Sequence, residues 1–329
     1  MKLSKIIKVI DSAQVKNFSE KEIEDIAYDS REVTDGALFF ALHGEKSDGH
    51  QFLKDAIERG AYACVVENDI GVTAVPIIIV PDARKELAVV SSHFFEFPSK
   101  KLTVIGVTGT NGKTTTTFLI KHILDCAGKK TGLIGTLGCF IGKTKINLPN
   151  TTPESLWLQR IMRTMVDSCI EVCVMEVSSH GIAMGRISAI DFDIGILTNI
   201  SRDHLDFHKT FNDYVQTKLL FFKGLKKEAT AFINSDIHES DRFIQNASSG
   251  CFTYGMREKA DFAGEIRNIN ERGIEMTINH NGKRFRLMAP LRGRYNAYNV
   301  IPAFACSYHI GLSAKQIEHA IGSFRGVQG

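Results

Sequence analysis

Short apolar runs alternate with amphipathic segments through the first hundred residues. Apolar runs bounded by turn residues predict strands at 38–42, 61–67 and 76–80. Apolar residues at helical spacing predict helices at 52–60 and 84–95, the first of them ending on glycine. The proline and charged residues of 97–101 indicate a boundary, so we expect an N-terminal α/β domain over 1–98 and a second domain over 99–329.

The second domain begins with continuous apolar runs, as expected for strands buried on both faces. These runs occupy 103–107, 172–177 and 194–198, with helical segments at 153–166 and 211–222. Strands separated by helices predict a parallel sheet covered on both faces.

Beyond residue 233 the apolar and polar positions alternate instead. The alternation predicts antiparallel strands at 264–270, 273–279 and 283–288, with a hairpin turn at His280-Asn281-Gly282 and two final helices at 296–309 and 313–324. The fold class is therefore α/β: an N-terminal α/β domain, then a central domain with a mostly parallel sheet and a smaller antiparallel sheet.

Composition restricts the class of protein. The 329 residues are 43% hydrophobic and 23% charged, with a formal net charge of +3, which is typical of a soluble globular protein and argues against nucleic-acid binding. No run is long enough for a membrane helix, and the N-terminal apolar run is too short for a signal peptide, so we expect a cytoplasmic protein. Seven scattered cysteines predict buried free thiols; we interpret Cys169 and Cys173 as core residues.

The strongest local signal is the run Gly109-Thr110-Asn111-Gly112-Lys113-Thr114-Thr115, between a predicted buried strand and a helix. In such a phosphate loop, backbone amides and the helix N-terminus face phosphate oxygens. Lys113 is expected to reach the β- and γ-phosphates, and the Thr114 hydroxyl to bind Mg²⁺. The first glycine of the usual spacing is replaced by Val107. A turn that only joins strand to helix is the alternative.

Other polar residues have two interpretations when taken singly. Glu176 follows a predicted strand, where a carboxylate suits a hard cation or is simply an exposed strand-end acid. Asp203, His204, Asp206 and His208 fit either a transition-metal site or solvated polarity. Lysines on helices, as Lys218 is, are mostly surface charges.

The phosphate-loop sequence resembles that of the Mur ligases and their folylpolyglutamate synthetase relatives. Further runs match the Mur ligases in order and spacing along nearly the whole chain. They are Asp29-Ser30-Arg31, Asn150-Thr151-Thr152-Pro153-Glu154, Glu176-Val177-Ser178-Ser179-His180, Thr198-Asn199-Ile200-Ser201-Arg202-Asp203-His204-Leu205-Asp206, Lys218, and Gly293-Arg294-Tyr295-Asn296-Ala297-Tyr298-Asn299. The pattern is most similar to the branch that adds the third amino acid to UDP-MurNAc-L-Ala-D-Glu.

The resemblance implies an ATP-dependent amide ligase of peptidoglycan precursor synthesis that uses Mg²⁺ and an acyl phosphate. Its implied partners are UDP-MurNAc-L-Ala-D-Glu and an amino acid, meso-diaminopimelate or L-lysine, with no nucleic acid and no membrane. The catalytic residues implied are Lys113, Lys218 and His204, and the metal ligands are Thr114, Glu176, His204 and Lys218 as a carbamate. ATP is assigned to residues 109–115 and Asn299, and the UDP substrate to Ser30, Thr151, Thr152, Ser178 and Arg186.

Taken without the resemblance, Asp29-Ser30-Arg31 is a loop or helix cap, and Asn296 and Asn299 are capping residues. The Mur ligases also have a C-terminal domain, and residues 324–329 stand where it would begin, so we expect this chain to lack that domain and to be inactive alone. The alternatives are another ligase of this superfamily or a nucleotide-binding module without catalysis.

Overall fold

The chain folds into two compact units. The computed structural model describes residues 1–44, 47–69, 71, 74–247, 250–257 and 259–327, so the end of the terminal stretch 324–329 lies outside the described residues. Unit 1 comprises Met1–Pro98, Glu154–Arg163 and Met184–Ile190. Unit 2 comprises Ser99–Pro153, Thr164–Ala183 and Asp191–Gly329.

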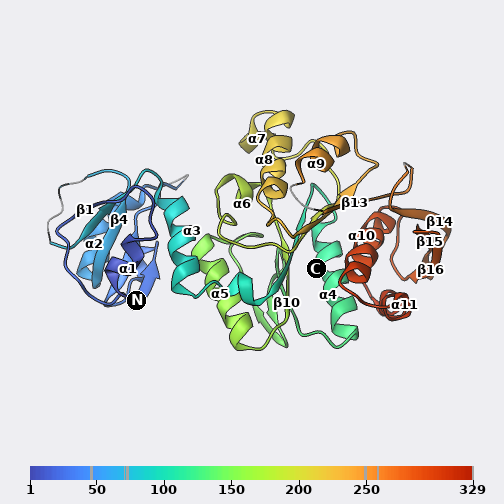
Figure 1. The fold of residues 1–329 in the computed structure, drawn as a ribbon, viewed down its shortest axis with the longest axis horizontal. Helices are drawn as coiled ribbons and strands as arrows, with labels where there is room; N and C mark the ends of the chain where they lie inside the picture. The colour runs from blue at the N-terminus through green and yellow to red at the C-terminus, as the bar shows by residue number, and fades with distance from the viewer. Residues whose placement is uncertain (45–46, 70, 72–73, 248–249, 258, 328–329) are drawn as a thin grey trace. The chain divides into compact units, whose positions relative to one another are not determined.

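Unit 1 is built on a five-stranded sheet with the strand order β1-β5-β4-β3-β2. Its elements, in chain order, are α1 (Leu3–Ile7), β1 (Gln14–Lys16), β2 (Asp25–Ala27), η1 (Ser30–Glu32), β3 (Ala37–Phe40), η2 (Gly49–Phe52), α2 (Leu53–Glu58), β4 (Ala61–Val66), β5 (Ile77–Ile79) and α3 (Ala83–Phe94). Strands β2 to β5 run parallel, and β1 is antiparallel to β5. The N-terminal elements of this unit are drawn in blue in Figure 1.

The central strand β3 explains the two cores of unit 1. All four of its residues are buried. Leu38 and Phe40 pack on the face that carries α1 and α3, whereas Phe39 packs on the face that carries α2. Successive strand side chains point to opposite faces, so a run with no polar member requires helices on both sides.

Unit 2 contains the larger sheet. Its elements are η3 (Pro98–Lys101), β6 (Thr103–Thr108), α4 (Lys113–Cys126), β7 (Thr131–Gly135), β8 (Gly138–Ile141), β9 (Thr144–Ile146), β10 (Val172–Glu176), α6 (Ser179–Ala183), β11 (Ile194–Leu197), α7 (Leu205–His208), α8 (Phe211–Lys223), β12 (Thr230–Asn234), α9 (Ser240–Asn246), β13 (Gly250–Gly255), β14 (Phe262–Asn270), β15 (Gly273–His280), β16 (Lys283–Ala289), α10 (Tyr295–His309) and α11 (Ala314–Ser323). Helix α5 (Ser155–Asp167) begins in unit 1 and ends in unit 2.

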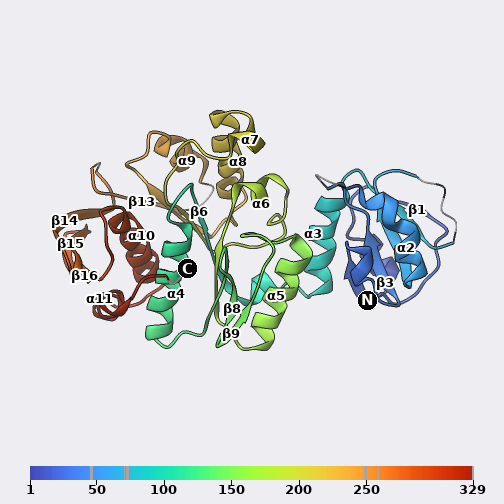
Figure 2. The ribbon, with the colours of Figure 1, turned by 180° about the vertical axis from the view of Figure 1, so that it is seen from behind.

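The eleven strands of this sheet follow the order β16-β15-β14-β13-β12-β11-β6-β10-β7-β8-β9. The strands from β14 to β7 pair in parallel, and the pairs at both ends, β14-β15-β16 and β7-β8-β9, are antiparallel (Figure 2). The antiparallel strands of the C-terminal part therefore continue the large sheet instead of forming a separate one. The link is the parallel pairing of Tyr254 and Gly255 with Phe262 and Ala263.

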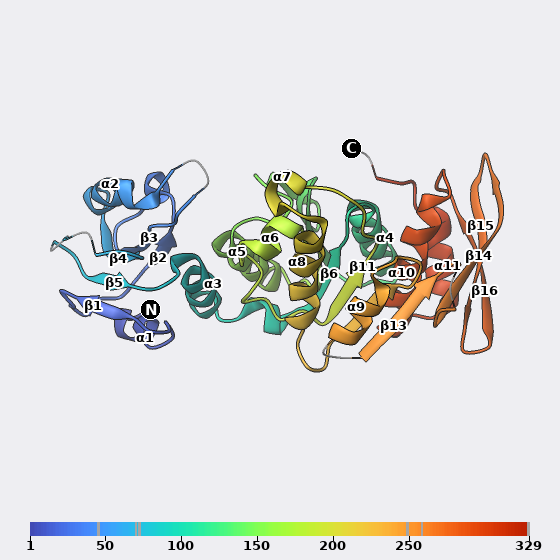
Figure 3. The same ribbon diagram turned by 90° about the horizontal axis from the view of Figure 1, so that it is seen from above.

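Helices cover both faces of the central strands (Figure 3). Helices α4, α10 and α11 share one hydrophobic core with Ile105, Val107 and Ile196 of the sheet. On the other face, Phe221 of α8 reaches the backbone of β6 and β11, because a Cβ on Gly106 would lie 2.7 Å from the Phe221 ring and one on Gly195 3.3 Å from it. The layered α/β fold predicted from the apolar runs is confirmed.

The predicted hairpin turn also forms. His280 pairs with Lys283, and both central residues adopt positive φ, 47° for Asn281 and 74° for Gly282. That is the backbone that Asn-Gly turns favour. Among the described residues, no helix is both long enough and apolar enough to cross a membrane.

The cysteines differ in part from the expectation. All seven are free thiols, and Cys64, Cys139, Cys173 and Cys306 are buried. The placement of Cys169 in the core was wrong, because it is exposed and has a φ of 56° in the turn after α5.

Candidate functional site

The phosphate loop lies at the carboxyl ends of three adjacent parallel strands. Strand β6 ends at Thr108, and the loop leads into α4, which begins at Lys113. Glu176, the last residue of β10, pairs with Val107, and Leu197, the last of β11, pairs with Thr108. Ligands of open α/β sheets bind at this edge. Val107 belongs to β6 and is buried, so the position of the missing glycine is occupied by the strand itself.

Two glycines of the loop are required by its geometry. Gly109 has a φ of 145°, and a Cβ there would lie 1.9 Å from the Thr198 Oγ1 atom. Gly112, with a φ of 86°, would place a Cβ 2.3 Å from Asn299 Oδ1. Side chains other than glycine rarely adopt such a backbone, so both positions combine conformational and steric demands.

Thr198 and Asn199 hold the loop from β11. The Asn199 amide accepts from the Asn111 backbone N–H at 2.9 Å and donates to the Asn111 carbonyl at 2.9 Å. The Thr198 hydroxyl donates to the same carbonyl at 2.7 Å. Both residues belong to the run 198–206 that matches the Mur ligases, but the sequence predicted no role for them. Their position directly after a buried strand could have indicated that they lie at the ligand-binding edge of the sheet.

Two lysine amines converge on the loop. Lys113 Nζ donates to the carbonyls of Gly109 and Thr110, both at 2.9 Å. Lys218 Nζ donates to the Gly109 carbonyl at 3.2 Å and to Thr108 Oγ1 at 3.3 Å. Burial lowers the pKa of Lys113, and burial followed by the nearby Lys113 charge lowers that of Lys218 well below its ordinary value. Lys218 is only 1% exposed, so the surface-lysine alternative is excluded.

Glu176 is fully buried opposite the start of α4. Its Oε2 accepts from Thr114 Oγ1 at 2.9 Å and from Thr136 Oγ1 at 3.1 Å, while Oε1 accepts from the Thr136 backbone N–H at 2.9 Å. All these donors are neutral. A buried carboxylate beside a phosphate-loop threonine fits a hard cation such as Mg²⁺. Thr136 carried no sequence signal, because it follows a strand, β7, that was not predicted.

Three of the predicted substrate residues surround Glu176. Thr151 Oγ1 lies 3.1 Å from Thr136 Oγ1. The buried Thr152 hydroxyl donates to the Glu176 carbonyl at 2.9 Å and accepts from the Ser178 backbone N–H at 2.9 Å. Ser178 Oγ accepts from the Gly181 N–H at 3.1 Å. The Thr152 hydroxyl is thus used within the protein, which favours a positioning role for this residue.

His204 directly precedes α7, has a φ of 51° and is more exposed than the groups above. Its ring lies 4.9 Å from that of His180, and its Nε2 is 3.5 Å from Asp203 Oδ2. His208 is 6% exposed, and its ring is 5.2 Å from that of Tyr214. The assignment of His204 as a metal ligand stays a prediction.

A cavity of about 570 Å³ adjoins the loop. It is lined by Asn111, Gly112, Asn199, Ser201, Asn234, Asp236, Ile237, Arg257, Tyr295, Tyr298 and Asn299. Asn299 is 8% exposed and accepts from the Thr116 hydroxyl at 3.3 Å. Asp236 accepts from the Tyr298 hydroxyl at 2.7 Å and from the Met256 backbone N–H at 2.6 Å. The size of the cavity, and a mainly apolar lining with a few polar groups such as Asn299, suit a purine base.

The two remaining substrate candidates belong to unit 1. Ser30 is 8% exposed and opens η1. Its neighbour Asp29 caps this turn by accepting from the Arg31 N–H at 2.9 Å, and the Arg31 guanidinium holds the pKa of Asp29 below its usual value. Arg186 lies 3.5 Å from the Glu154 carboxylate.

Comparison with known proteins identifies the family. The family "Mur ligase middle domain" matches residues 107–307, and "Mur ligase family, catalytic domain" matches residues 22–101. The chain belongs to the Mur ligase family.

Curated relatives of this Mur ligase match it along its whole length. It is 40% identical over 336 residues to UDP-N-acetylmuramoyl-L-alanyl-D-glutamate--2,6-diaminopimelate ligase 1 of Clostridium acetobutylicum, and 39% identical to the enzyme of the same name, without the number, from Bacillus velezensis. The match covers 100% of this chain and 68% of each relative.

Solved structures agree with this assignment. A structure of a UDP-N-acetylmuramoyl-L-alanyl-D-glutamate--2,6-diaminopimelate ligase has a TM-score of 0.84 at 27% identity, covering 94% of this chain and 64% of that one. MurF from Acinetobacter baumannii, with a TM-score of 0.69 at 21% identity over 94% of this chain and 64% of that one, shares the fold.

Proposed function

We propose that this Mur ligase takes part in joining 2,6-diaminopimelate to UDP-MurNAc-L-Ala-D-Glu at the expense of ATP, in peptidoglycan precursor synthesis. The names of its curated relatives support both the acceptor and the amino acid. Of the two amino acids that the sequence left open, diaminopimelate is therefore preferred over L-lysine. The chain spans about two thirds of the length of these relatives, so the complete reaction is part of the proposal.

The observation that carries this proposal is the arrangement at the end of β6. A phosphate loop, two buried amines and a buried carboxylate meet within hydrogen-bonding distance of residues 108–114. Forming an amide from a carboxylate requires activation of that carboxylate, proposed here as an acyl phosphate made from ATP, and several negative charges then come together. Preorganised cations stabilise such charge effectively in a site shielded from water.

Each residue of the loop has a proposed task toward ATP. The backbone amides of 109–112 and the N-terminus of α4 are directed at the phosphates, and Lys113 neutralises the transferred γ-phosphoryl group. Thr115 extends the first turn of the same helix. The 570 Å³ cavity takes the adenine against Asn299. A MurF from Thermotoga maritima, similar in fold with a TM-score of 0.62, was solved with ADP.

The oxygen atoms of Glu176 and Thr114 are suitable ligands for Mg²⁺. Thr114 and Glu176 are the ligands that this structure favours, and His204 is a further proposed ligand. When bound, the ion supplies positive charge to the phosphate oxygens and orients them. The remaining task proposed for the protein is to align the Glu176 carboxylate, which accepts hydrogen bonds from the Thr114 and Thr136 hydroxyls.

Lys218 is proposed to carry a carbamate that provides an additional oxygen ligand. Its amine is buried with a lowered pKa, and the neutral amine is the form that adds CO₂. The nitrogen lone pair forms the N–C bond, the amine loses one proton to solvent, and a carboxylate-bearing side chain results. Thr151 and Ser178 are proposed to contact the UDP-linked substrate, with Thr152 holding Ser178 in place. Ser30 and Arg186 are proposed contacts of that substrate in unit 1.

Isothermal titration calorimetry tests the proposal. We expect UDP-MurNAc-L-Ala-D-Glu to bind this chain more tightly than UMP does, and a folate not to bind. ATP should bind in the presence of Mg²⁺. Replacing Lys113 with alanine should weaken the binding of ATP and leave the binding of UDP-MurNAc-L-Ala-D-Glu unchanged. Binding of the folate in preference to the UDP compound would instead indicate a folylpolyglutamate synthetase-type ligase.

A further inference from the structure

Helix α5 begins beside three charged side chains of unit 1, here called the Arg84–Glu154–Arg186 trio. Glu154 is 7% exposed. Arg84 Nη1 donates to Glu154 Oε2, and Arg186 Nε lies 3.5 Å from the same oxygen. The other carboxylate oxygen accepts from the Ser155 backbone N–H at 3.2 Å. One carboxylate thus faces two guanidinium groups, and the trio holds more positive than negative charge.

Both arginines are fixed by second contacts. Arg84 Nη2 donates to the His43 carbonyl at 2.9 Å, and Arg186 Nη2 contacts Met184 Sδ at 3.1 Å. Their side chains are 19% and 14% exposed. Because the guanidinium group is planar and rigid, two contacts to each arginine define the orientation of the whole group.

Tyr28 stands close to the trio: burial, then the Glu154 charge, and after it the charges of Glu32 and Asp29, raise its pKa to about 12. Its phenol therefore stays protonated at neutral pH and is able to donate a hydrogen bond. Two guanidinium groups and a phenol form a donor set that suits a phosphate or carboxylate group.

We infer that Glu154 is a positioning residue, which aims Arg84 and Arg186 at an oxyanion of the UDP-linked substrate, and that Arg84 is a substrate-binding residue. The inference rests on the proposed function, because it requires that substrate. It adds Arg84 and Glu154 to the predicted contact Arg186. Glu154, the last residue of the run Asn150–Glu154, is thereby assigned the role of positioning the two arginines.

The variant Glu154→Gln separates positioning from charge balance. Removing the carboxylate makes the cluster more positive, so charge alone predicts tighter binding of an anion. Loss of positioning predicts the reverse, because both guanidinium groups lose the acceptor that orients them. We expect the dissociation constant of UDP-MurNAc-L-Ala-D-Glu to rise roughly 10- to 100-fold, the range for a lost charge-assisted contact. Glu154→Asp should recover part of the affinity.

The experiment is calorimetry on the whole chain, with the wild type and the variants Arg84→Gln, Glu154→Gln and Glu154→Asp. Each variant is also titrated with ATP, which binds in unit 2, and its melting temperature is recorded. Arg160→Gln is the matched control, because Arg160 forms a comparable ion pair with Asp25 at 3.0 Å in the same unit. We expect Arg84→Gln and Glu154→Gln to weaken the binding of the UDP-linked substrate but not that of ATP. Arg160→Gln should leave the binding of both ligands unchanged.

The outcomes are distinguishable. A wild-type chain that binds ATP but not UDP-MurNAc-L-Ala-D-Glu contradicts the proposed function. A wild-type chain that binds both, with unchanged or tighter substrate binding in Glu154→Gln, overturns the inference, as does an equal loss of affinity for both ligands. Titrating UDP and UDP-MurNAc as well identifies the oxyanion. If Arg84→Gln weakens UDP equally, the group is the pyrophosphate; if it weakens only the dipeptide compound, the group is a peptide carboxylate.

Discussion

The Nζ atoms of Lys113 and Lys218 share one acceptor, the carbonyl oxygen of Gly109, at 2.9 and 3.2 Å. Lys113 begins α4 and Lys218 lies in the middle of α8, so the loop brings together amines that are far apart in sequence. Two positive charges this close repel each other, and the Lys113 charge contributes to the lowered pKa of Lys218. One amine is thereby suited to stay charged for phosphate and the other to become neutral.

Replacing Lys113 with alanine should weaken ATP binding roughly 10- to 100-fold, because charge-assisted hydrogen bonds to phosphate are lost. Binding of UDP-MurNAc-L-Ala-D-Glu should not change. Calorimetry with both ligands measures this. The control is Lys121→Ala on the same helix, which breaks only the pair with Asp125 at 2.6 Å. Equal effects of the two substitutions on ATP would contradict the role of Lys113.

Gly112→Ala and Gly128→Ala form a matched pair at the two ends of α4. Both glycines have positive φ, 86° and 83°, so each substitution should cost about 1 kcal/mol of folding free energy. A Cβ at Gly112 also meets Asn299 Oδ1 at 2.3 Å, whereas one at Gly128 meets nothing within 4 Å. Gly112→Ala should therefore displace Asn299 and weaken ATP by about tenfold, an order of magnitude for one lost hydrogen-bonded contact. Urea unfolding measures the cost in stability, and calorimetry measures the loss of ATP affinity. Similar ATP affinity in both variants would contradict the predicted contact between Asn299 and ATP.

Thr136→Val removes one of the hydroxyl donors to Glu176. A buried carboxylate that loses a donor is destabilised by roughly 1–3 kcal/mol, and its alignment should loosen. We expect a lower melting temperature and a reduced effect of Mg²⁺ on ATP affinity. Thr131→Val, at the start of β7, the strand that Thr136 follows, loses only a bond to the Lys129 carbonyl at 3.2 Å and should leave the Mg²⁺ effect intact. An unchanged Mg²⁺ effect in Thr136→Val would exclude Thr136 from the site.

His309 should make stability depend on pH. The residue is exposed overall, but its ring packs on Phe232 and Phe252, and this partial burial lowers its pKa below the ordinary 6.5. The unfolded chain therefore binds the proton more readily than the folded chain. Its contribution to stability is complete above pH 6.5 and is lost as the pH falls through the lowered folded-state pKa. Denaturant unfolding at several pH values should therefore show a shallower loss of stability in His309→Gln. His238→Gln, at a side chain 97% exposed, should match the wild type.

Sequence patterns predicted those parts of the fold where local signals and tertiary packing agree. The hairpin at Asn281-Gly282 and the strand leading into Gly109 are examples, because turn chemistry and apolar runs act over a few residues. Strands β8 and β9 were missed, because their pairing is decided by the edge that β7 offers. Thr136 was missed for the same reason: its importance comes from Glu176, forty residues away. Arg84 and Glu154 are seventy residues apart in the sequence, so no local pattern could predict that they form an ion pair.

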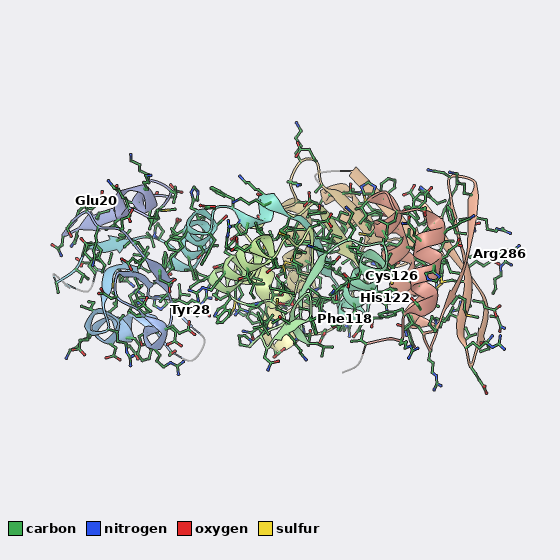
Figure 4. All side chains as sticks on the ribbon, turned by 90° about the horizontal axis from the view of Figure 1, so that it is seen from below. Glu20, Tyr28, Phe118, His122, Cys126 and Arg286 are labelled. Atoms are coloured by element: carbon green, nitrogen blue, oxygen red, sulfur yellow. The ribbon has the colours of Figure 1, made fainter. Side chains whose placement is uncertain are left out.

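In the part of the chain that the structure describes, β16 and β9 are the two edge strands of the eleven-stranded sheet. Unpaired backbone groups at such an edge invite the strand of another molecule. Arg284 and Arg286 are exposed on β16, and Lys145 is exposed on β9; Arg286 is labelled in Figure 4. Docking two copies edge to edge would bring like charges close together. These cationic residues are therefore expected to disfavour edge-to-edge association of this long sheet.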